Sequence, residues 1–315
     1  MPTQSQSPAD PAHQSVAALP RDRLSVVIGI ATTGRAGVVR TTVLHMANLA
    51  DRPDRVVVSV ANPADVDATG LDDLPFKVDV LHGPKGSSAQ RNTVLDHAGD
   101  AGIVFFIDDD FLIAEGSVTA LRNLFATHED VVMATGHVLA DGLRGPGYDH
   151  AEGLSMLERA VPVDADAAPR TVYSTYGCNM AVRGAAIRAY PERFDTILPL
   201  YGWLEDLDFS RRMAAFGRIV EDPHLRGVHL ATKTGRISGR RLGYSQIANP
   251  VYLVRKGTYH WARALKLVTG NVLANSAKSL WPEPWIDRRG RLTGNILAFR
   301  DLLRGRCRPG RIHDL

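Results

Sequence analysis

Three consecutive aspartates follow directly after a wholly apolar segment of the chain. Residues 103–107 read Ile-Val-Phe-Phe-Ile, and Asp108, Asp109 and Asp110 come next. Neighbouring carboxylates repel one another unless a cation or solvent relieves the repulsion. A hard divalent cation binds carboxylate oxygens and can take phosphate oxygens of a nucleotide as further ligands. The spacing of Asp108 and Asp110 therefore predicts a metal site, and an acidic turn that caps a helix starting near Glu115 is the structural alternative.

A second group of acidic residues lies at 203–209, and the basic pair Arg211 and Arg212 follows it. If residues 204–216 form a helix, Glu205, Asp206 and Asp208 crowd its first turn, where negative charge suits the helix dipole. A carboxylate at this place could instead take the proton of a hydroxyl group, which is a weak nucleophile while protonated. These residues alone leave both interpretations open.

A histidine and a basic segment follow in the last third of the chain. His229 comes after the strand-like residues 226–228, and its neutral imidazole is a candidate metal ligand, although a lone histidine is more often structural. The Gly-rich segment 232–241 carries Lys233, Arg236, Arg240 and Arg241. We expect this segment to be mobile, and its cations could fold over a diphosphate.

Strand and helix patterns alternate around these residues. Apolar and β-branched runs predict strands at 24–30, 55–60, 76–81 and 103–107, with helices at 38–49 and 87–97. This order predicts an α/β fold with a doubly wound, mostly parallel sheet flanked by helices. Ligands bind such sheets at the carboxyl ends of the strands, where the loop 31–35 and the aspartates both lie. Beyond them we expect strands at 131–136 and 171–173, and helices at 151–160, 204–216 and 248–281.

The composition fits a large folded protein with an uneven distribution of charge. The chain has 315 residues, of which 44% are apolar and 23% are charged, which is enough for a sizeable core. Residues 226–315 contain 18 Lys and Arg against 4 Asp and Glu, a net charge of +14, whereas residues 1–225 contain 19 against 30, a net charge of −11. The basic region could face phosphates, nucleic acid or an anionic membrane, or it could be a solvated surface.

Other features concern the compartment in which the protein works. Residues 1–22 are polar, lack the features of a signal peptide, and are expected to form a flexible tail. The two cysteines are too few for a disulfide framework. No apolar run approaches the roughly 20 residues that span a bilayer. We therefore expect a cytoplasmic protein.

In their order along the chain, four segments resemble the family 2 glycosyltransferases. They are the loop 31–35, the segment 86–92 with its Arg-Asn pair, the aspartates after the fourth strand, and the Trp-x-Glu-Asp-x-Asp pattern at 203–208. The resemblance covers about residues 24–217. It implies a GT-A fold and an inverting, single-displacement transfer of a sugar from a nucleoside diphosphate sugar, for which we expect a UDP-sugar.

The resemblance also implies roles for individual residues. By position, Asp108 would contact the ribose, Asp110 would bind Mg²⁺ or Mn²⁺ with His229 as a further candidate ligand, and Asp206 would be the catalytic base. The metal would act as a Lewis acid that stabilises the leaving nucleoside diphosphate. Glu205 and Trp203 would bind the acceptor. The remaining contacts to the nucleotide sugar would come from Ala31, Thr33, Arg35, Asn62, Gly86, Arg91, Asp109, Lys233 and Arg236.

Two of these assignments stay open. The second strand of the family usually ends in an aspartate that recognises the base, whereas this chain reads Ser-Val-Ala-Asn-Pro-Ala-Asp at 59–65. Asn62 or Asp65 could substitute for that aspartate, so the base specificity is undecided. Asp109 is undecided between the ribose and the metal.

The C-terminal residues 291–306 look like the tail of bacterial exopolysaccharide glycosyltransferases, although this match is looser. Such enzymes extend a polyprenyl-diphosphate-linked saccharide at the cytoplasmic face of the membrane. The resemblance thus implies a saccharide or lipid-linked saccharide acceptor and no nucleic-acid partner. Trp261, Trp281 and Trp285 lie among basic residues, which suits peripheral docking on anionic lipid.

We expect three parts: a tail at 1–22, a GT-A domain at 23–245 and a helical, basic C-terminal region at 246–315. Within the GT-A domain, residues 23–112 would form the nucleotide-binding half, and residues 113–245 the acceptor half and lid. Two other classes of function compete. A nucleotidyltransferase would want a Lys-containing Gly-rich loop after the first strand, where residues 33–37 offer a single Arg. A non-enzymatic module that binds membrane or nucleic acid would leave both acidic groups unexplained.

Overall fold

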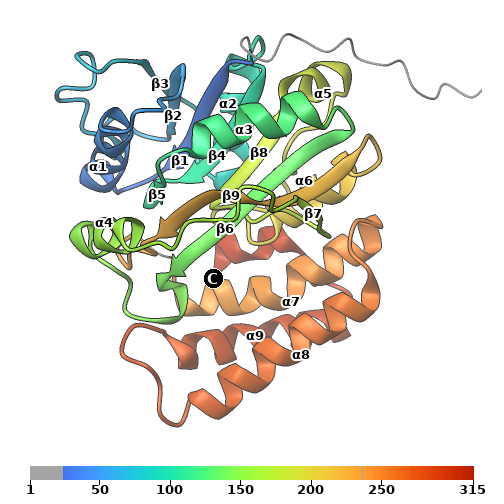
Figure 1. Ribbon diagram of the computed structural model, residues 1–315. Coiled ribbons are helices and arrows are strands. Elements are labelled where there is room, and N and C mark those ends of the chain that lie inside the picture. Colours follow the sequence, from blue (N-terminus) through green and yellow to red (C-terminus); the bar gives the residue numbers. More distant parts are fainter. Residues whose placement is uncertain (1–23, 236) are drawn as a thin grey trace, which may run out of the picture.

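The N-terminal half of the protein is a parallel sheet between helices. A computed structural model describes residues 24–235 and 237–315 (Figure 1). The strands lie in the order β3-β2-β1-β4 and are all parallel: β1 (Val26–Thr32), β2 (Arg55–Val60), β3 (Lys77–His82) and β4 (Ile103–Asp108). All residues at 103–107 are buried, as expected for a strand that is covered on both faces. The predicted tail at 1–22 and Arg236 lie outside the described residues.

In the second half of the sheet, β9 lies between β5 and β6. Its strands are β5 (Phe111–Ile113), β6 (Val131–Asp141), β7 (Arg170–Thr171), β8 (Asn179–Arg183) and β9 (Arg218–His229). The order continues β4-β8-β6-β9-β5, with β8 antiparallel to β4 and to β6, and β9 parallel to β6. In this register His229 lies beside Asp141 on one side and beside Phe111 on the other. The predicted fold class, a mostly parallel α/β sheet flanked by helices, is confirmed.

Successive residues of β1 point to opposite faces of the sheet and enter two different cores. Ile28 belongs to the core that includes α1 (Ala36–Ala47) and α3 (Ser117–Thr127). Val27 belongs to the core on the other face, which includes α2 (Ser87–His97), α5 (Gly184–Ala189) and α6 (Glu205–Met213). The helix α4 (His150–Glu158) packs near the end of β9. Short 3₁₀ helices occupy Pro63–Asp65, Gly142–Arg144 and Pro309–Asp314.

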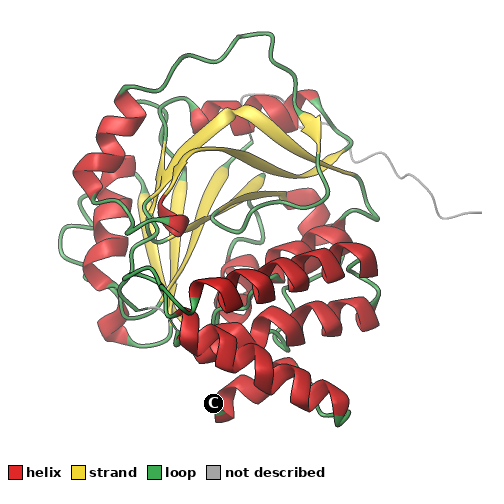
Figure 2. Cartoon of the chain, turned by 90° about the horizontal axis from the view of Figure 1, so that it is seen from below, coloured by secondary structure: helices red, strands yellow, loops and turns green. Residues whose placement is uncertain are grey.

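Three helices form a layer of their own on one side of the sheet (Figure 2). They are α7 (Gly239–Lys256), α8 (Trp261–Lys278) and α9 (Arg288–Leu303). A Cβ atom at Gly243 would lie 2.0 Å from the carbonyl oxygen of Arg291, and one at Gly294 would lie 2.1 Å from that of Arg240. Glycine therefore permits α7 and α9 to approach this closely. In the described parts of the chain, no helix is long and apolar enough to cross a membrane.

The predicted element boundaries hold in the N-terminal half and shift in the C-terminal half. The first four strands and the two helices between them lie within 2 residues of their predicted bounds. Residues 239–241, expected in a mobile segment, form the first turn of α7, because Ser238 caps that helix. Residues 257–260 divide the helix predicted at 248–281 into α7 and α8. The expected domain boundary between 245 and 246 falls inside α7.

Candidate active site

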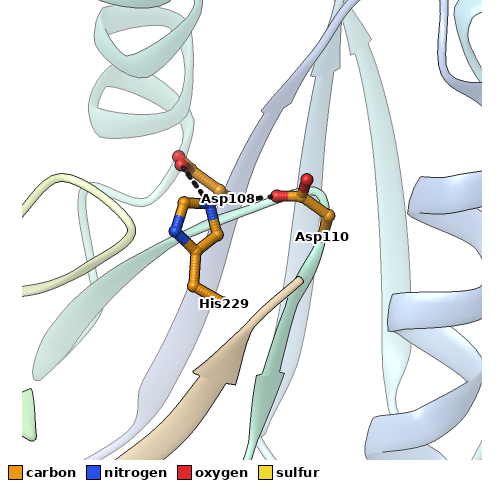
Figure 3. Close-up of side chains that lie close together, drawn as sticks. All are labelled: Asp108, Asp110 and His229. Atoms are coloured by element: carbon orange, nitrogen blue, oxygen red, sulfur yellow. Dashed lines mark ion pairs between the residues drawn. The ribbon is translucent and has the colours of Figure 1, made fainter. Parts of the chain in front are cut away.

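Two carboxylates and an imidazole meet where β4, β5 and β9 come together. Asp108 ends β4, Asp110 precedes β5, and His229 ends β9 (Figure 3). The Nε2 atom of His229 lies 3.5 Å from Oδ1 of Asp110 and 3.7 Å from Oδ2 of Asp108. One ligand atom from each residue lies within 4.8 Å of the others. Two oxygens and one nitrogen at this spacing fit a divalent cation such as Mn²⁺ or Mg²⁺.

His229 is oriented by a pair of residues that the sequence did not single out. Its Nδ1 atom lies 3.0 Å from Oδ1 of Asp141, and the hydroxyl of Tyr176 donates to Oδ2 of the same carboxylate at 3.0 Å. A carboxylate on one ring nitrogen fixes the orientation of the imidazole and leaves the other nitrogen for a metal. Asp141 could be found only from the register of β6 with β9, which pairs it with His229.

The charges in this group compensate one another. Burial alone would lower the pKa of His229, but hydrogen bonds with Asp110 and Asp141 and the charge of Asp108 raise it to about 10. Burial alone would raise the pKa of Asp110, but His229 and Arg35 lower it to about 2. A protonated imidazole at this position balances the negative charge of the carboxylates around it.

Asp109 points away from the metal-ligand group. Its Oδ1 atom accepts from Nη1 of Arg35 at 2.7 Å, and its Oδ2 atom accepts from the hydroxyl of Thr32 at 2.6 Å. Burial raises the pKa of its carboxyl to about 7, against the attraction of Arg35. Asp109 therefore anchors the loop after β1. The same guanidinium lies 3.3 Å from Oδ2 of Asp110.

The aspartates do not cap the helix that follows them. The helix α3 begins at Ser117, and its cap comes from Asp51, whose carboxylate accepts from the amides of Gly116 and Thr119 at 3.0 Å each. The structural alternative for the acidic triplet, a helix-capping turn near Glu115, is therefore wrong.

A buried arginine connects the metal-ligand group to the acidic turn of α6. Arg91 is 4% exposed; its guanidinium pairs with Glu205, lies 3.3 Å from Oδ1 of Asp108 and donates to the carbonyl of Gly177 at 2.9 Å. These bonds hold the guanidinium of Arg91 in place, and its contact with the nucleotide sugar stays a prediction. The guanidinium of Arg91 therefore sets the distance between Asp108 of β4 and Glu205 of α6.

The three acidic residues at the start of α6 have different surroundings. The carboxylate of Asp206 accepts from the amides of Gly177 and Leu207 at 2.8 Å each, and burial raises its pKa. Burial also raises the pKa of Glu205, to about 8, although Arg91 opposes this shift. Asp208 points elsewhere and binds three side chains of the surrounding structure: Lys256 at 2.8 Å, Thr258 at 2.7 Å and Arg212 at 3.1 Å.

Gly177 lies in close contact with Asp206 and Arg91, with little room for a side chain. A Cβ atom there would lie 3.3 Å from Oδ2 of Asp206 and 3.4 Å from Nη2 of Arg91. Trp203, the residue predicted to bind the acceptor, precedes this turn, and its carbonyl accepts from Asn249 of α7 at 2.8 Å. The acidic turn is therefore held both by the sheet and by the C-terminal layer.

The predicted nucleotide-binding loops lie together at the ends of β1 and β2. Ala31 pairs in register with Ser59 and Asp108, and Thr33 follows in the next loop. The buried Gln90 ties these strands, because its Nε2 donates to the carbonyls of Thr32 at 2.7 Å and Ser59 at 2.8 Å. Gly86, with φ 131°, precedes the first residue of α2.

Asn62 and Asp65, the two candidates for base recognition, bind each other, and the side-chain amide of Asn62 donates to Oδ2 of Asp65 at 3.4 Å. The Asp65 carboxylate accepts from Gly34 at 2.7 Å and from the amide of Asn62 at 2.9 Å. Burial alone would raise its pKa, but these bonds lower it. Asn62 itself is exposed.

The segment after β9 is attached to the metal-ligand group. The amide of Thr232 donates to Oδ2 of Asp110 at 2.7 Å, and Nε of Arg35 donates to the carbonyl of Thr234 at 3.0 Å. Lys233 donates to the carbonyl of Gly142 at 2.9 Å. Arg236 lies outside the described residues.

Two cavities adjoin this site. The larger, of about 740 Å³, is lined mainly by polar residues of β6, β7 and the loop before β8: Thr135, Gly136, His137, Val138, Asp141, Arg144, Arg170, Ser174, Thr175, Tyr176 and Glu221. We call it the β6 groove. The smaller, of about 500 Å³, lies between the start of α1 and the segment 230–234.

The fold is that of a GT-A glycosyltransferase. The sequence matches the family described as "Glycosyl transferase family 2" over residues 27–185, and the chain belongs to this family. It is therefore an enzyme of the glycosyltransferase class, which decides against the nucleotidyltransferase and the non-enzymatic module. No curated protein gives a significant match to the sequence.

Solved structures support the fold at low sequence identity. The TarS 1–349 structure from S. aureus with UDP-GlcNAc has 16% identity and a TM-score of 0.51, covering 92% of this chain and 83% of that chain. The chain spans 46% of a longer TarS structure. A mannosyltransferase from Pyrobaculum calidifontis with GDP-Man and Mn²⁺ has 16% identity and a TM-score of 0.51, covering 94% and 88%. GalNAc-T7 with UDP, GalNAc and Mn²⁺ has 13% identity and a TM-score of 0.51, covering 89% and 57%.

Proposed function

We propose that this glycosyltransferase moves a sugar from a nucleoside diphosphate sugar, expected to be a UDP-sugar, to a hydroxyl group of a saccharide, with inversion. The observation that carries the proposal is the connection made by Arg91. This one buried side chain contacts Asp108 in the metal-ligand group and Glu205 beside Asp206. A donor site and a base are thereby held at a fixed separation, as a single displacement requires.

In the donor half, Asp108 would contact the ribose, and Asp110 with His229 would hold Mn²⁺ or Mg²⁺. When bound there, the cation supplies Lewis-acid stabilisation of the nucleoside diphosphate that leaves. The imidazole favours Mn²⁺ over the harder Mg²⁺. Ala31, Thr33, Asn62 and Gly86 would contact the base and ribose. Arg35 would reach the diphosphate together with Lys233 and Arg236.

In the acceptor half, Asp206 would act as the base. Its carboxylate takes the proton of the acceptor hydroxyl while the hydroxyl oxygen forms a bond to the anomeric carbon, and the bond from that carbon to the diphosphate breaks. Burial raises the pKa of Asp206, which makes it a better proton acceptor than an exposed aspartate. Glu205 and Trp203 would bind the acceptor.

We also propose that the acceptor lies in the β6 groove and is a saccharide linked to a polyprenyl diphosphate, in the synthesis of an exopolysaccharide or cell-surface polysaccharide. The groove is polar, and its residues Thr175 and Tyr176 directly precede Gly177, which binds Asp206. Such an acceptor would place the enzyme at the cytoplasmic face of the membrane. The net charge of +14 in residues 226–315 supports that location.

Asp206→Asn tests the assignment of the base. We expect this variant to lose at least about 100-fold in transfer rate, the size of a general-base contribution. A screen of UDP-, GDP- and dTDP-sugars with Mn²⁺ would first identify the nucleotide sugar that raises the melting temperature of the wild type. The same nucleotide sugar should also raise the melting temperature of Asp206→Asn. Asp208→Asn in the same helical turn is the matched control: it should lose stability but keep its transfer rate per folded molecule. Wild-type transfer by a folded Asp206→Asn variant would contradict the assignment.

A further inference from the structure

Exposed apolar side chains gather in the C-terminal helical layer. Among the described residues, 13 large apolar side chains are exposed, and 9 of them lie in residues 261–303. Single exposed apolar residues are ordinary, whereas a group of them marks an interaction surface. The 9 residues are Trp261, Leu265, Leu273, Leu280, Trp281, Trp285, Ile296, Phe299 and Leu303.

These side chains lie on the outward faces of their helices. In α8, Trp261, Leu265 and Leu273 follow one another at intervals of four and eight residues, which places them on one side of the helix. The buried residues of this helix are Ala264 and Asn275. Beyond the end of α8, Leu280 is 65% exposed and Trp281 is 82% exposed. We call the outward side of α8 together with residues 279–285 the basic-apolar face.

The residues around this face carry a net positive charge, and the acidic side chains among them are already engaged. Residues 257–308 contain 10 Lys and Arg against 3 Asp and Glu, a net charge of +7. Each acidic residue is already engaged: Glu283 binds Lys278 and Arg288, Asp287 caps α9, and Asp301 accepts from the hydroxyl of Tyr244. In the part of the chain that the structure describes, no carboxylate pairs with Lys266 of α8.

The basic-apolar face reaches the rim of the β6 groove. The Nε1 atom of Trp285 donates to the carbonyl of Arg144 at 3.2 Å, and Arg144 lines that groove. Figure 1 shows the loop between α8 and α9 on the same side of the molecule as the arrowheads of β6 and β9. A surface that holds this face therefore also lies next to the opening where the acceptor is proposed to enter.

We propose that the basic-apolar face docks on an anionic lipid bilayer and thereby brings the β6 groove to the membrane surface. Tryptophan and leucine side chains between lysines and arginines are typical of segments that lie in the interface of an anionic membrane. A second copy of the same face would oppose positive charge with positive charge, which disfavours a dimer. A nucleic-acid site would not need so many exposed leucines. The inference rests on the proposed function for its acceptor, but lipid binding itself can be tested without any transfer reaction.

Flotation of the full chain with vesicles tests the proposal. The probes are vesicles of phosphatidylcholine alone and of phosphatidylcholine mixed with phosphatidylglycerol. We expect binding to the anionic vesicles at low salt, at least about tenfold less binding to the neutral ones, and loss of binding at high salt. The double variant Trp281→Ser, Lys266→Glu should bind anionic vesicles at least about tenfold more weakly. The matched control is Val161→Ser, Arg159→Glu, which changes an 80% exposed valine and an exposed arginine outside the C-terminal layer and should bind as wild type.

The outcomes separate this inference from the proposed function. No binding to anionic vesicles, equal binding to neutral vesicles, or undiminished binding by the Trp281→Ser, Lys266→Glu variant would overturn the docking surface. A concentration-dependent dimer in sedimentation that the same variant abolishes would assign the face to a second copy and would also overturn it. The variant should keep the donor-induced thermal stabilisation of the wild type, because neither residue lies in the donor site. Loss of that stabilisation in wild type would instead count against the proposed function.

Discussion

Metal binding at Asp108, Asp110 and His229 should release one proton. Despite the burial of His229, its carboxylate neighbours raise its pKa to about 10, so the metal-free imidazole is protonated at neutral pH. A cation needs the lone pair of Nε2, because Nδ1 is engaged by Asp141 at 3.0 Å. The pKa of Asp110, although burial opposes the shift, is lowered to about 2, so this carboxylate is already ionised. Only the His229 proton must leave.

The size of the effect follows from the pKa of His229. Each pH unit below that pKa lowers the apparent metal affinity about tenfold, or about 1.4 kcal/mol. From about pH 6 to about pH 8, the affinity for Mn²⁺ should therefore rise about 100-fold, or about 2.7 kcal/mol. His229→Gln should abolish this pH dependence, since an amide does not titrate in this range, and should weaken binding at the upper end.

Isothermal titration of the EDTA-treated chain with Mn²⁺, in two buffers of different ionisation enthalpy, counts the protons released. Asp109→Asn is the matched control, because burial raises the pKa of Asp109 to about 7 and that carboxyl could titrate in the same range. The control should keep the full pH dependence. Release of much less than one proton, or a pH dependence that survives in His229→Gln, would refute the ligand role of His229.

Four further substitutions probe the residues that support the site. Arg91→Met should lower the free energy of unfolding, measured with urea, by about 3–5 kcal/mol at pH 8, because it leaves buried carboxylates without their partner. The loss should be smaller at pH 5, because burial raises the pKa of Glu205 to about 8 and the side chain is then neutral. Asp208→Asn should cost about 1–3 kcal/mol by calorimetry, because it weakens contacts with three donors. Asp141→Asn should weaken Mn²⁺ binding by about 10–100-fold in titrations, while Tyr176→Phe, the milder change, should lose less.

The sequence predicted the N-terminal half of the fold well because three of its four strands, β1, β2 and β4, are buried on both faces and therefore strongly apolar. The run at 103–107 is such a strand, and its bounds were correct to within one residue. The later strands depend on pairing that one sequence does not show. β9 runs from Arg218 to His229, yet only its last residues had a strand pattern, because Asp222 and Pro223 interrupt it. The two glycines that bring α7 and α9 together act through contacts between distant residues.

The sequence identified the residues grouped at the candidate metal site but not the residues that orient them. Asp108, Asp110 and His229 were named together and lie together, although metal binding by them stays a prediction. Asp141 and Tyr176 were missed because their relation to His229 arises from the register of β6 with β9 and from a side-chain contact across 35 residues. The separation of Asp206 from Asp208, one facing Gly177 and the other Lys256, depends on where α6 packs. Charge spacing along a helix does not reveal that difference.

The attachment of Thr232 to Asp110 has a thermodynamic consequence. Oδ2 of this carboxylate holds the Thr232 amide at 2.7 Å, while Oδ1 faces His229 at 3.5 Å. The loop and the cation site thus share one side chain. Any free energy by which an ion favours this loop arrangement must equal the free energy by which the arrangement favours the ion. Retention of the ion and opening of the loop are then coupled equilibria, so exchanging one metal for another should shift the fraction of molecules in which the loop is open.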